Sequence, residues 1–304
     1  MRNPPRVAII LLNWNSYEDT ANCISSIQEI EYNNYFTIIV DNGSTDSSGE
    51  QLSEEFEDCA VIFNDDNLGF SGGCNVGIEH ALEESAEYIL LLNNDMTVDQ
   101  NFLRPLVATA EQHERVAAVG GVIYEGKTDK IWDAGGKMRP YIANVKRHTK
   151  IQSPTEYRTE FVTCAQALLT REFLEENKLD EEFFFGVEEI ELNWRANQND
   201  WKLFINPNSE VYHNVGGATE EMYAGEELFS SFQKYHNTRG RFYFASKNLT
   251  SVQAFTYYFS AAFIYPIFYF WLGLRYNRWD ILRAHSVSIF DYLFTGTVRK
   301  PKDF

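Results

Sequence analysis

The stretch Tyr88–Asp95 constrains the fold of this chain more than any other. Its first five residues, Tyr88-Ile-Leu-Leu-Leu92, form an apolar run that is too short for a helix and is typical of a strand buried on both faces. The run then ends abruptly in Asn93-Asn94-Asp95. In open α/β sheets, ligands bind outside the carboxyl ends of the strands, so Asp95 stands where a ligand could bind. Taken alone, such an aspartate caps the following turn more often than it binds a ligand.

Short apolar runs alternate with helical patterns through the first part of the chain. Strands are predicted at about 6–13, 36–40, 60–63, 88–92 and 116–119, and helices at about 16–27, 47–56, 75–84 and 99–114. Ser16 and Asp19 fit a capping box at the start of the first helix. This alternation predicts an α/β fold with a mainly parallel central sheet covered by helices.

Charge is distributed unevenly along the chain. Residues 1–233 carry 16 Lys and Arg against 41 Asp and Glu, whereas residues 234–304 carry 10 against 3. The formal net charge of −18 argues against a nucleic-acid-binding protein, which would carry a basic surface. The acidic body and the basic end of the chain are therefore expected to meet different partners.

The basic end contains a long uncharged stretch. None of the 27 positions from Asn248 to Leu274 is charged, which is long enough for a membrane span. The stretch is rich in aromatic residues, Pro266 interrupts it, and basic residues flank both ends, so the positive-inside rule gives no orientation. Three interpretations stay open: a membrane span, a re-entrant or interfacial helix pair, and a buried helix that packs on the rest of the chain.

Polar side chains follow four of the predicted strands. The clusters are Asn13-Trp14-Asn15, Asp41-Asn42-Gly43-Ser44, Asn64-Asp65-Asp66-Asn67 and Asn93-Asn94-Asp95. Four such clusters along one sheet edge indicate a site for a polar ligand. The first βα turn lacks the glycine fingerprint of dinucleotide-binding proteins, and the glycine-rich segment 69–77 matches neither that fingerprint nor the phosphate loop. That segment still opens a helix, whose N-terminus favours an anionic ligand.

Asp95 and His213 are the best candidates for metal ligands. A carboxylate oxygen suits Mg²⁺ or Mn²⁺, and the addition of an imidazole favours Mn²⁺. The two residues are far apart in the sequence, which therefore does not show that they meet.

Glu188, Glu189 and Glu191 stand together at the predicted start of a helix, directly after an aromatic run. Acidic residues at this position complement the helix dipole. The alternative is that one of them is a general base whose pKa is raised by partial desolvation against Phe183–Phe185.

Together, these residues resemble glycosyltransferase family 2, and within it the rhamnosyltransferase-like branch with a GT-A fold. The matching segments are 13–15, 40–46, 67–77, 90–95, 179–184, 188–195 and 211–213, and their order and spacing cover about residues 6–245. The resemblance implies a GT-A catalytic domain at 1–235, with a nucleotide-binding half at about 1–95 and an acceptor half at about 96–235. A basic, aromatic, membrane-associated helical tail would follow at 236–304.

The resemblance also implies a role for each residue. The nucleotide would be bound by Asn13, Trp14, Asn15, Asp41, Asn42, Gly72, Asn75, Asn93 and Asn94. Asp95 and His213 would hold Mn²⁺ or Mg²⁺, and Glu189 would be the catalytic base, with Glu188 as a substitute. Glu191 and Arg195 would contact the acceptor or the sugar.

The implied activity is an inverting, metal-dependent transfer of a sugar from a nucleoside-diphosphate sugar. The basic, aromatic tail favours a lipid-linked acceptor, carried on a polyprenyl or dolichyl phosphate, or another cell-surface glycan. Because donor nucleotide sugars are cytosolic, the active site is expected at the cytoplasmic face of the cell membrane.

Two positions depart from the family pattern. Asn93 replaces the first acid of the Asp-x-Asp metal motif, and Glu189 stands where the family usually has Asp. A catalytically degenerate, nucleotide-sugar-binding subunit is therefore one alternative. A sugar nucleotidyltransferase is the other, although the glycine-rich, basic N-terminal signature of that class is missing.

Overall fold

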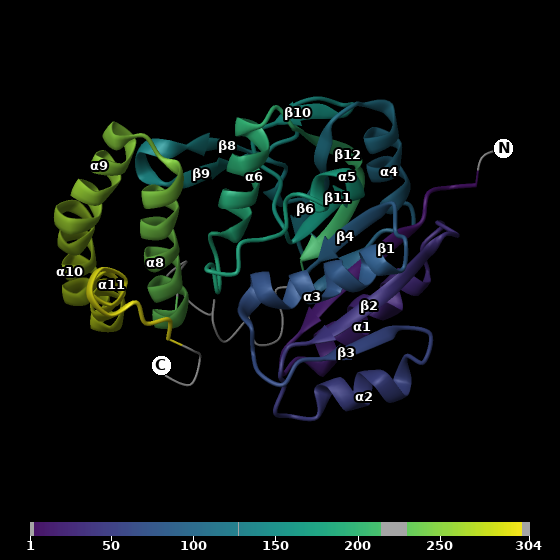
Figure 1. The fold of residues 1–304 in the computed structure, drawn as a ribbon, viewed down its shortest axis with the longest axis horizontal. Helices are drawn as coiled ribbons and strands as arrows, with labels where there is room; N and C mark the ends of the chain where they lie inside the picture. The colour runs from purple at the N-terminus through teal and green to yellow at the C-terminus, as the bar shows by residue number, and fades with distance from the viewer. Residues whose placement is uncertain (1–2, 127, 214–229, 300–304) are drawn as a thin grey trace.

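The computed structural model describes residues 3–126, 128–213 and 230–299 (Figure 1). In this part of the chain a ten-stranded sheet has helices on both faces, and the C-terminal helices stand to one side of it (Figure 1). The strands of the sheet are β1 (Val7–Asn13), β2 (Tyr35–Asp41), β3 (Ala60–Phe63), β4 (Tyr88–Leu92), β5 (Met96–Val98), β6 (Val116–Glu125), β7 (Ile131–Asp133), β10 (Tyr157–Thr159), β11 (Gln166–Thr170) and β12 (Lys202–His213). A separate hairpin consists of β8 (Gly136–Arg139) and β9 (Asn144–Arg147). The helices that cover the sheet are α1 (Tyr17–Gln28), α2 (Ser48–Glu55), α3 (Gly69–Glu83), α4 (Leu103–Gln112), α5 (Arg171–Leu174) and α6 (Glu188–Gln198).

The sheet is mixed and mainly parallel. Its main path runs β10-β12-β6-β11-β4-β1-β2-β3, with β5 paired to β12 and β7 to β6. β1 pairs in parallel with β2 and β4, β2 with β3, and β6 with β12, whereas β11 lies antiparallel between β4 and β6. Because β1, β2 and β4 run in the same direction, the polar clusters that follow them lie at one edge of the sheet.

Two apolar cores sandwich the sheet, and β1 contributes to both. Val7, Ile9 and Leu11 face a core shared with α1, α2 and α4. Ala8 and Ile10 face a second core shared with α3, α5 and α6. This alternation follows from the two-residue period of a strand, and it explains why β1 is apolar at almost every position.

Glycines let α3 pack closely on the sheet. A Cβ atom on Gly73 would lie 2.4 Å from Leu12, and one on Gly77 would lie 2.7 Å from Ile10. Such contacts are shorter than carbon atoms tolerate, so these positions require glycine or a shift of the helix. The glycine-rich segment therefore serves helix–sheet packing directly.

Some local predictions were wrong. The helix after β5 begins at Leu103 rather than at Asp99, and the strand predicted to end at Val119 continues to Glu125. Ser16 makes no capping hydrogen bond, because its hydroxyl donates instead to the Asp19 carboxylate at 2.8 Å. The predicted capping box is therefore absent from α1.

The C-terminal helices begin with α8 (Ser231–Asn248), which is followed by α9 (Ser251–Phe259), the π-helical turn η2 (Ser260–Ile264), α10 (Tyr265–Tyr276) and α11 (Trp279–Phe290). From Ser251 to Tyr276 the chain is one 26-residue helix, which is long and apolar enough to cross a membrane by length and composition. The wider π turn immediately precedes Pro266, whose ring cannot follow a regular α-helical turn.

A third core joins α8 and α9 to the rest of the molecule. Phe242 and Phe244 of α8 pack there with Phe183, Val187 and Ile190. The domain boundary predicted between residues 235 and 236 therefore falls inside α8, an unbroken helix. The expected acceptor half and tail also include 214–229 and 300–304, which lie outside the described residues.

Candidate active site

A buried hydrogen-bond network joins the carboxyl ends of β1 and β2. Asn13 donates its side-chain amide to Asp41 Oδ1 at 2.7 Å and to Ser48 Oγ at 2.9 Å. The hydroxyl and backbone N–H of Ser44 donate to the same carboxylate at 2.6 and 3.1 Å. Trp14, at the same strand end, is 41% exposed. A fixed carboxylate beside an exposed indole is a suitable combination for binding a planar, hydrogen-bonding base.

The same network extends to neighbouring segments. Asn94, after β4, donates to the Thr20 hydroxyl at 2.8 Å, and that hydroxyl donates to Asn13 Oδ1 at 2.9 Å. The side chain of Asn15 accepts a hydrogen bond from Thr45 N at 2.7 Å. Three of the predicted nucleotide-binding segments thus form one connected polar edge.

Asn93 lies next to this edge. It lines a cavity of about 190 Å³ together with Cys164 and Phe185. This cavity lies between the end of β4 and the aromatic run that precedes α6.

Asp95 and His213 meet at the end of β4. β5 begins directly after Asp95 and pairs with the end of β12, where Met96 lies opposite His213. As a result, His213 Nε2 lies 2.9 Å from Asp95 Oδ2. Asp95 Oδ1 and His213 Nδ1 are both buried, and neither has a hydrogen-bond partner among the described residues.

This pair fits part of the coordination shell of a divalent cation. A carboxylate and an imidazole are donors that Mn²⁺ accepts readily, and unpartnered buried oxygen and nitrogen atoms need a partner. Within the described ranges, no group of three or more His, Cys, Asp or Glu side chains is arranged to hold a metal ion. The remaining ligands would therefore come from water and from a bound diphosphate.

Glu189 is held in place by three hydrogen-bond donors. Arg147 of β9 donates to Glu189 Oε1 at 2.8 Å. The Thr163 hydroxyl and the backbone N–H of Cys164 donate to Glu189 Oε2 at 2.8 and 3.2 Å. A carboxylate has about four acceptor positions, so one is left for a substrate proton.

Arg147 connects Glu189 to a second, buried carboxylate. Its guanidinium also bonds Asp133 Oδ2 at 3.1 Å. Burial raises the pKa of Asp133 to about 7, although Arg147 acts in the opposite direction. For Arg147 itself, burial lowers the pKa, but Glu189 and Asp133 outweigh that effect and raise it above its ordinary value. The arginine is therefore a permanent cation shared by two acids.

Trp132 links the two groups of candidate residues. Its indole stacks on the His213 ring, with centroids 5.3 Å apart, and the Arg147 guanidinium lies 4.5 Å from the Trp132 ring centroid. An unbroken series of contacts thus runs from Asp95 through His213, Trp132 and Arg147 to Glu189. Trp132, Arg147 and Glu189 also line one cavity of about 710 Å³.

Glu188 has a different environment from that of its neighbour. It is 6% exposed, and its carboxylate accepts a hydrogen bond from Val187 N at 2.8 Å. Burial, followed by the nearby charge of Glu189, raises the pKa of Glu188 to about 7. Glu189 lines the large cavity, whereas Glu188 is not among its lining residues. This geometry favours Glu189 as the base.

Three predicted nucleotide-binding residues are engaged in contacts within the fold. Asn42 accepts a hydrogen bond from Leu68 N at 3.1 Å. Asn75 donates to Leu179 O at 2.9 Å and accepts from Leu179 N at 3.1 Å. Gly72 lies within α3, where a Cβ would be 2.8 Å from the Leu68 side chain. These contacts position loops around the site, and direct binding of the nucleotide by these three residues stays a prediction.

Glu191 and Arg195 form an ion pair at 2.7 Å. Glu191 is 1% exposed, and Lys247 of α8 approaches it to 3.7 Å. Arg195 also donates to Lys178 O at 2.9 Å. The two residues tie α6 to a loop and to α8 and do not line the large cavity, so their contact with acceptor or sugar stays a prediction.

At the N-terminus of α3, two backbone N–H groups already donate hydrogen bonds within the fold. Gly69 N donates to Asn67 Oδ1, and Phe70 N donates to Phe184 O, each at 2.8 Å. Two of the N–H groups expected to bind an anion are therefore already paired.

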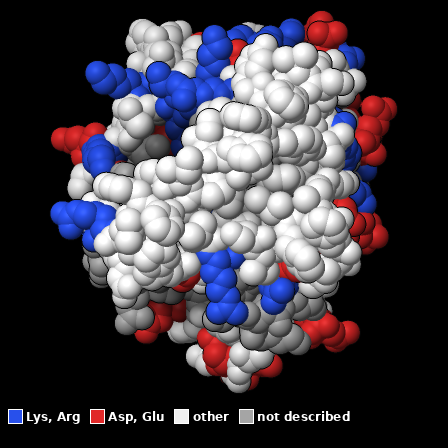
Figure 2. All heavy atoms as spheres, turned by 90° about the vertical axis from the view of Figure 1, so that its left-hand side faces the viewer, with Lys and Arg blue, Asp and Glu red and all other residues white. Residues whose placement is uncertain are grey.

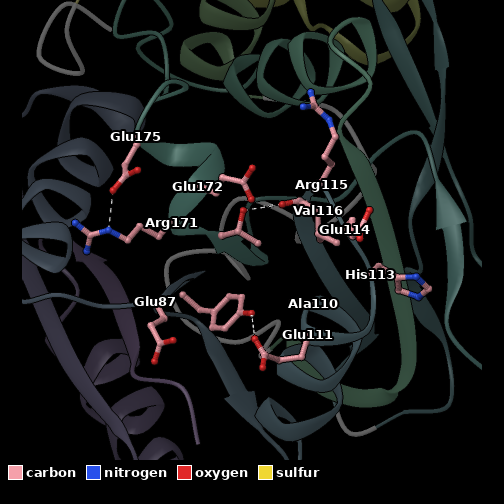
Figure 3. Close-up of a pocket in the computed structure, with 12 residues that line it drawn as sticks. Glu87, Ala110, Glu111, His113, Glu114, Arg115, Val116, Arg171, Glu172 and Glu175 are labelled. Atoms are coloured by element: carbon pink, nitrogen blue, oxygen red, sulfur yellow. Dashed lines mark hydrogen bonds and ion pairs between the residues drawn. The ribbon is translucent and has the colours of Figure 1, made fainter.

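A second large cavity, of about 660 Å³, lies at the opposite edge of the sheet (Figure 3). It is rich in glutamates, and it lies where β4 and β6 begin. Side chains of its lining bond one another: the Tyr88 hydroxyl donates to Glu111 at 2.5 Å, and Figure 3 shows Arg171 beside Glu175, with which it pairs at 2.7 Å. Its acidic lining repels a nucleotide diphosphate, and its position is not the one that parallel sheets use for ligands.

Sequence reasoning missed Trp132, Asp133, Arg147 and Thr163. The segment from Gly120 to about Arg158 shows no clear periodicity, because it folds as short strands and turns. Nothing in the sequence alone connects Arg147 to Glu189. The only signal was that an aromatic residue and an acid adjoin at 132–133 within an otherwise loosely patterned segment.

The chain was also compared with known proteins. Residues 8–177 match the family described as glycosyl transferase family 2. The low-salt glycan biosynthesis hexosyltransferase Agl10 of Haloferax volcanii is 33% identical over 102 residues, which is 33% of this chain and 31% of that protein. The dTDP-rhamnosyl transferase RfbF of Shigella flexneri is 22% identical over 231 residues, which is 73% of this chain and 74% of that protein.

A solved structure shares the fold. The crystal structure of GalNAc-T7 with UDP, GalNAc and Mn²⁺ superposes with a TM-score of 0.64 at 17% identity, covering 81% of this chain and 51% of that one. The expected GT-A-like α/β fold is thereby confirmed. The Haloferax match spans only about a third of that relative's length, so its activity is not carried over to this chain by similarity alone.

Proposed function

Because the chain belongs to glycosyl transferase family 2, we propose that it is an inverting, metal-dependent glycosyltransferase. Its donor is a nucleoside-diphosphate sugar, and its acceptor is a lipid-linked glycan on a polyprenyl or dolichyl phosphate, or another cell-surface glycan. The observation that carries this proposal is the series of contacts that leads from Asp95 and His213 to Glu189. It supports a single site that has a cation-binding end and a carboxylate base.

Different residues of the chain bind the nucleotide base, hold the cation and orient the catalytic carboxylate. The base of the nucleotide lies at the joined ends of β1 and β2, where Asp41 accepts its N–H groups. Asp95 and His213 would hold a divalent cation, which when bound would supply positive charge to stabilise the leaving diphosphate. Trp132 and Arg147 fix the orientation of His213 and Glu189 through stacking and the ion pair.

The reaction is a direct displacement. An acceptor hydroxyl oxygen forms a bond to the anomeric carbon while Glu189 takes the hydroxyl proton. The bond from that carbon to the diphosphate breaks, and the nucleoside diphosphate leaves with the electron pair. One base and one displacement invert the configuration at the anomeric carbon.

We place the tail on a membrane surface. Large apolar side chains recur every three or four residues along the outer side of α9, η2 and α10, and among them Phe255, Phe263 and Ile267 are 67%, 61% and 72% exposed. Figure 2 shows this broad uncharged face, with basic side chains at its upper left and lower borders and acidic ones along its right-hand margin. Such a surface fits an anionic lipid bilayer, which takes up apolar side chains and attracts the basic ones.

The packing of this long helix favours an interfacial position over a span. Its inner side is buried against α8 and α11, where Tyr257, Ala261 and Leu272 are at most 3% exposed. A span would carry the buried Lys234 and Arg239 of α8 into the hydrocarbon layer, at a large cost in free energy. The active site would then face the cytoplasm, where donor nucleotides are found.

A screen of UDP-, GDP- and dTDP-sugars with Mn²⁺ tests the proposal. We expect slow hydrolysis of one donor class without any acceptor, abolished by EDTA. Absence of hydrolysis with every donor would support a degenerate nucleotide-sugar-binding subunit. Release of pyrophosphate from a nucleoside triphosphate and a sugar phosphate would support a nucleotidyltransferase instead.

A further inference from the structure

The cavity of about 710 Å³ lies between the catalytic part of the molecule and the C-terminal helices. Arg147 and Glu189 line it on one side. Lys234 and Arg241 of α8, and Phe268 and Leu272 of α10, line it on the other. The proposed base thus shares one cavity with two further basic side chains and an apolar wall.

Lys234 is a buried lysine on the α8 side of this cavity. It is 8% exposed, and among the described residues no carboxylate lies within ion-pair distance of it. Its ammonium donates to the Tyr269 hydroxyl and lies 4.2 Å from the Tyr269 ring centroid. A buried charge of this kind is costly unless an opposite charge joins it.

Arg241 lies on the same helix, and within the part of the chain that the structure describes it too has no acidic partner. One of its terminal nitrogens donates to Asn144 Oδ1 at 3.2 Å. Its Nε atom is buried, and none of the described residues accepts its hydrogen bond. Two neighbouring cations with unused donors form a site for a phosphate-like anion.

The cavity is continuous with the proposed membrane face. Phe268 lines the cavity and is also 51% exposed on the outer surface of the tail. Leu272 and Ile281 extend the apolar lining between α10 and α11. A ligand with an anionic head inside and a hydrocarbon chain toward the surface matches both environments.

We propose that this cavity is the acceptor subsite, in which Lys234 and Arg241 bind the phosphate or diphosphate of a lipid-linked acceptor. The inference rests on the proposed function, selects the lipid-linked acceptor over another cell-surface glycan, and assigns the residues that bind its phosphate. The lipid chain follows α10 toward the membrane face, and the acceptor's sugar hydroxyl reaches Glu189. A neutral glycan acceptor would leave both cations uncompensated.

Anion binding should also change the protonation of Lys234. Burial, followed by the charge of Arg241, lowers the pKa of Lys234 to about 7. Tyr265 and Tyr269 of α10 and His285 of α11 also face it, and the ion pair of Arg147 and Glu189 lies on the opposite side of the same cavity. Glu189 is the acid in this set, but Arg147 already pairs with it, so a bound phosphate would supply a negative charge beside Lys234. Binding at pH 8 should therefore be accompanied by proton uptake.

Calorimetric titration of the full chain in detergent tests this proposal with three probes: farnesyl phosphate, farnesol and inorganic phosphate. We expect farnesyl phosphate to bind at least about tenfold more tightly than either other probe, with proton uptake at pH 8 seen by comparing two buffers. Lys234→Met and Arg241→Gln should each weaken its binding about tenfold or more. Lys137→Met, at an exposed lysine of the β8–β9 hairpin, is the matched control and should leave it unchanged.

Each other outcome contradicts the proposal. Equal affinity for farnesol would show an apolar groove without an anion site, and equal affinity for inorganic phosphate would show a site for a free anion. Unchanged binding by both variants would place the lipid elsewhere. Because Lys234→Met removes a buried charge, the melting temperature of this variant should not fall below that of the wild type. An unchanged melting temperature shows that weaker binding does not come from unfolding. Donor hydrolysis in the same preparations tests the proposed function independently, because it needs no acceptor.

Discussion

Glu188 and Glu189 are adjacent residues of the same type, yet the fold gives them opposite environments. Glu189 lies in the cavity and is compensated by Arg147, whereas Glu188 is buried and faces the start of its own helix. The side chain of Glu188 therefore carries a cost in stability that Glu189 avoids. That contrast separates the two candidates for the base.

The cost at Glu188 depends on pH. Its pKa is about 7 in the folded chain against an ordinary value of 4.5, so the folded state binds more protons between these values. The stability that Glu188 contributes at low pH is therefore lost as the pH rises from 4.5 through about 7. At pH 8, Glu188→Gln should be more stable than the wild type, by a free energy of unfolding on the order of 3 kcal/mol, and should therefore unfold at a higher temperature. This difference should vanish below pH 4.5.

Thermal denaturation at pH 4.5, 6 and 8 measures this difference. The variant should retain sugar transfer if Glu189 is the base. An inactive variant would reassign the base to Glu188, and a variant that gains no stability at pH 8 would contradict the raised pKa of Glu188.

Asp95 is the residue on which metal dependence is expected to rest. Asp95→Ala should abolish the increase in nucleoside diphosphate affinity that Mn²⁺ produces, because a buried ligand oxygen is lost. Calorimetry with and without Mn²⁺ measures this coupling. Asp99→Ala, which removes an exposed acid just after β5, should preserve it. Equal coupling in both variants would remove Asp95 from the metal site.

At the scale of elements, the C-terminal helices and the catalytic part share a hydrophobic core and an ion pair. α8 contributes to the third core, and Lys247 of α8 pairs with Asp180 at 2.5 Å. A truncation near Lys234 would therefore damage the fold as well as remove the membrane face. Surface substitutions test the tail more cleanly.

Phe263→Ser together with Ile267→Ser should weaken binding to anionic liposomes at least about tenfold, because two exposed apolar side chains no longer enter the bilayer. Cosedimentation with vesicles measures the effect, which should also weaken as salt increases. Ile151→Ser, at a 40% exposed position in the catalytic part, is the control. Vesicle binding that is indifferent to all three substitutions would argue against a membrane role for this face.

At the scale of the whole molecule, periodicity sufficed to predict the shared sheet edge within residues 1–95 but did not predict how the later strands pair. β1, β2 and β4 are apolar runs that end in polar clusters, so both their direction and the shared edge could be predicted. The antiparallel direction of β11 could not, because the strands it pairs with are distant in the sequence, and neither could the pairing of the short strand at Trp132, because its pattern is brief. Pairing of β12 with β5 and β6 is what brings His213 to Asp95, and no local pattern encodes it.

The proposed function depends most directly on Glu189, and the matched pair Glu189→Gln and Glu189→Asp tests it. Glu189→Gln should lower sugar transfer at least about 100-fold while the affinity for the nucleotide-sugar donor stays within about twofold, because only the proton acceptor is lost. Glu189→Asp keeps a carboxylate and should retain measurable transfer. Near-normal turnover by Glu189→Gln, with donor binding intact, would contradict the account.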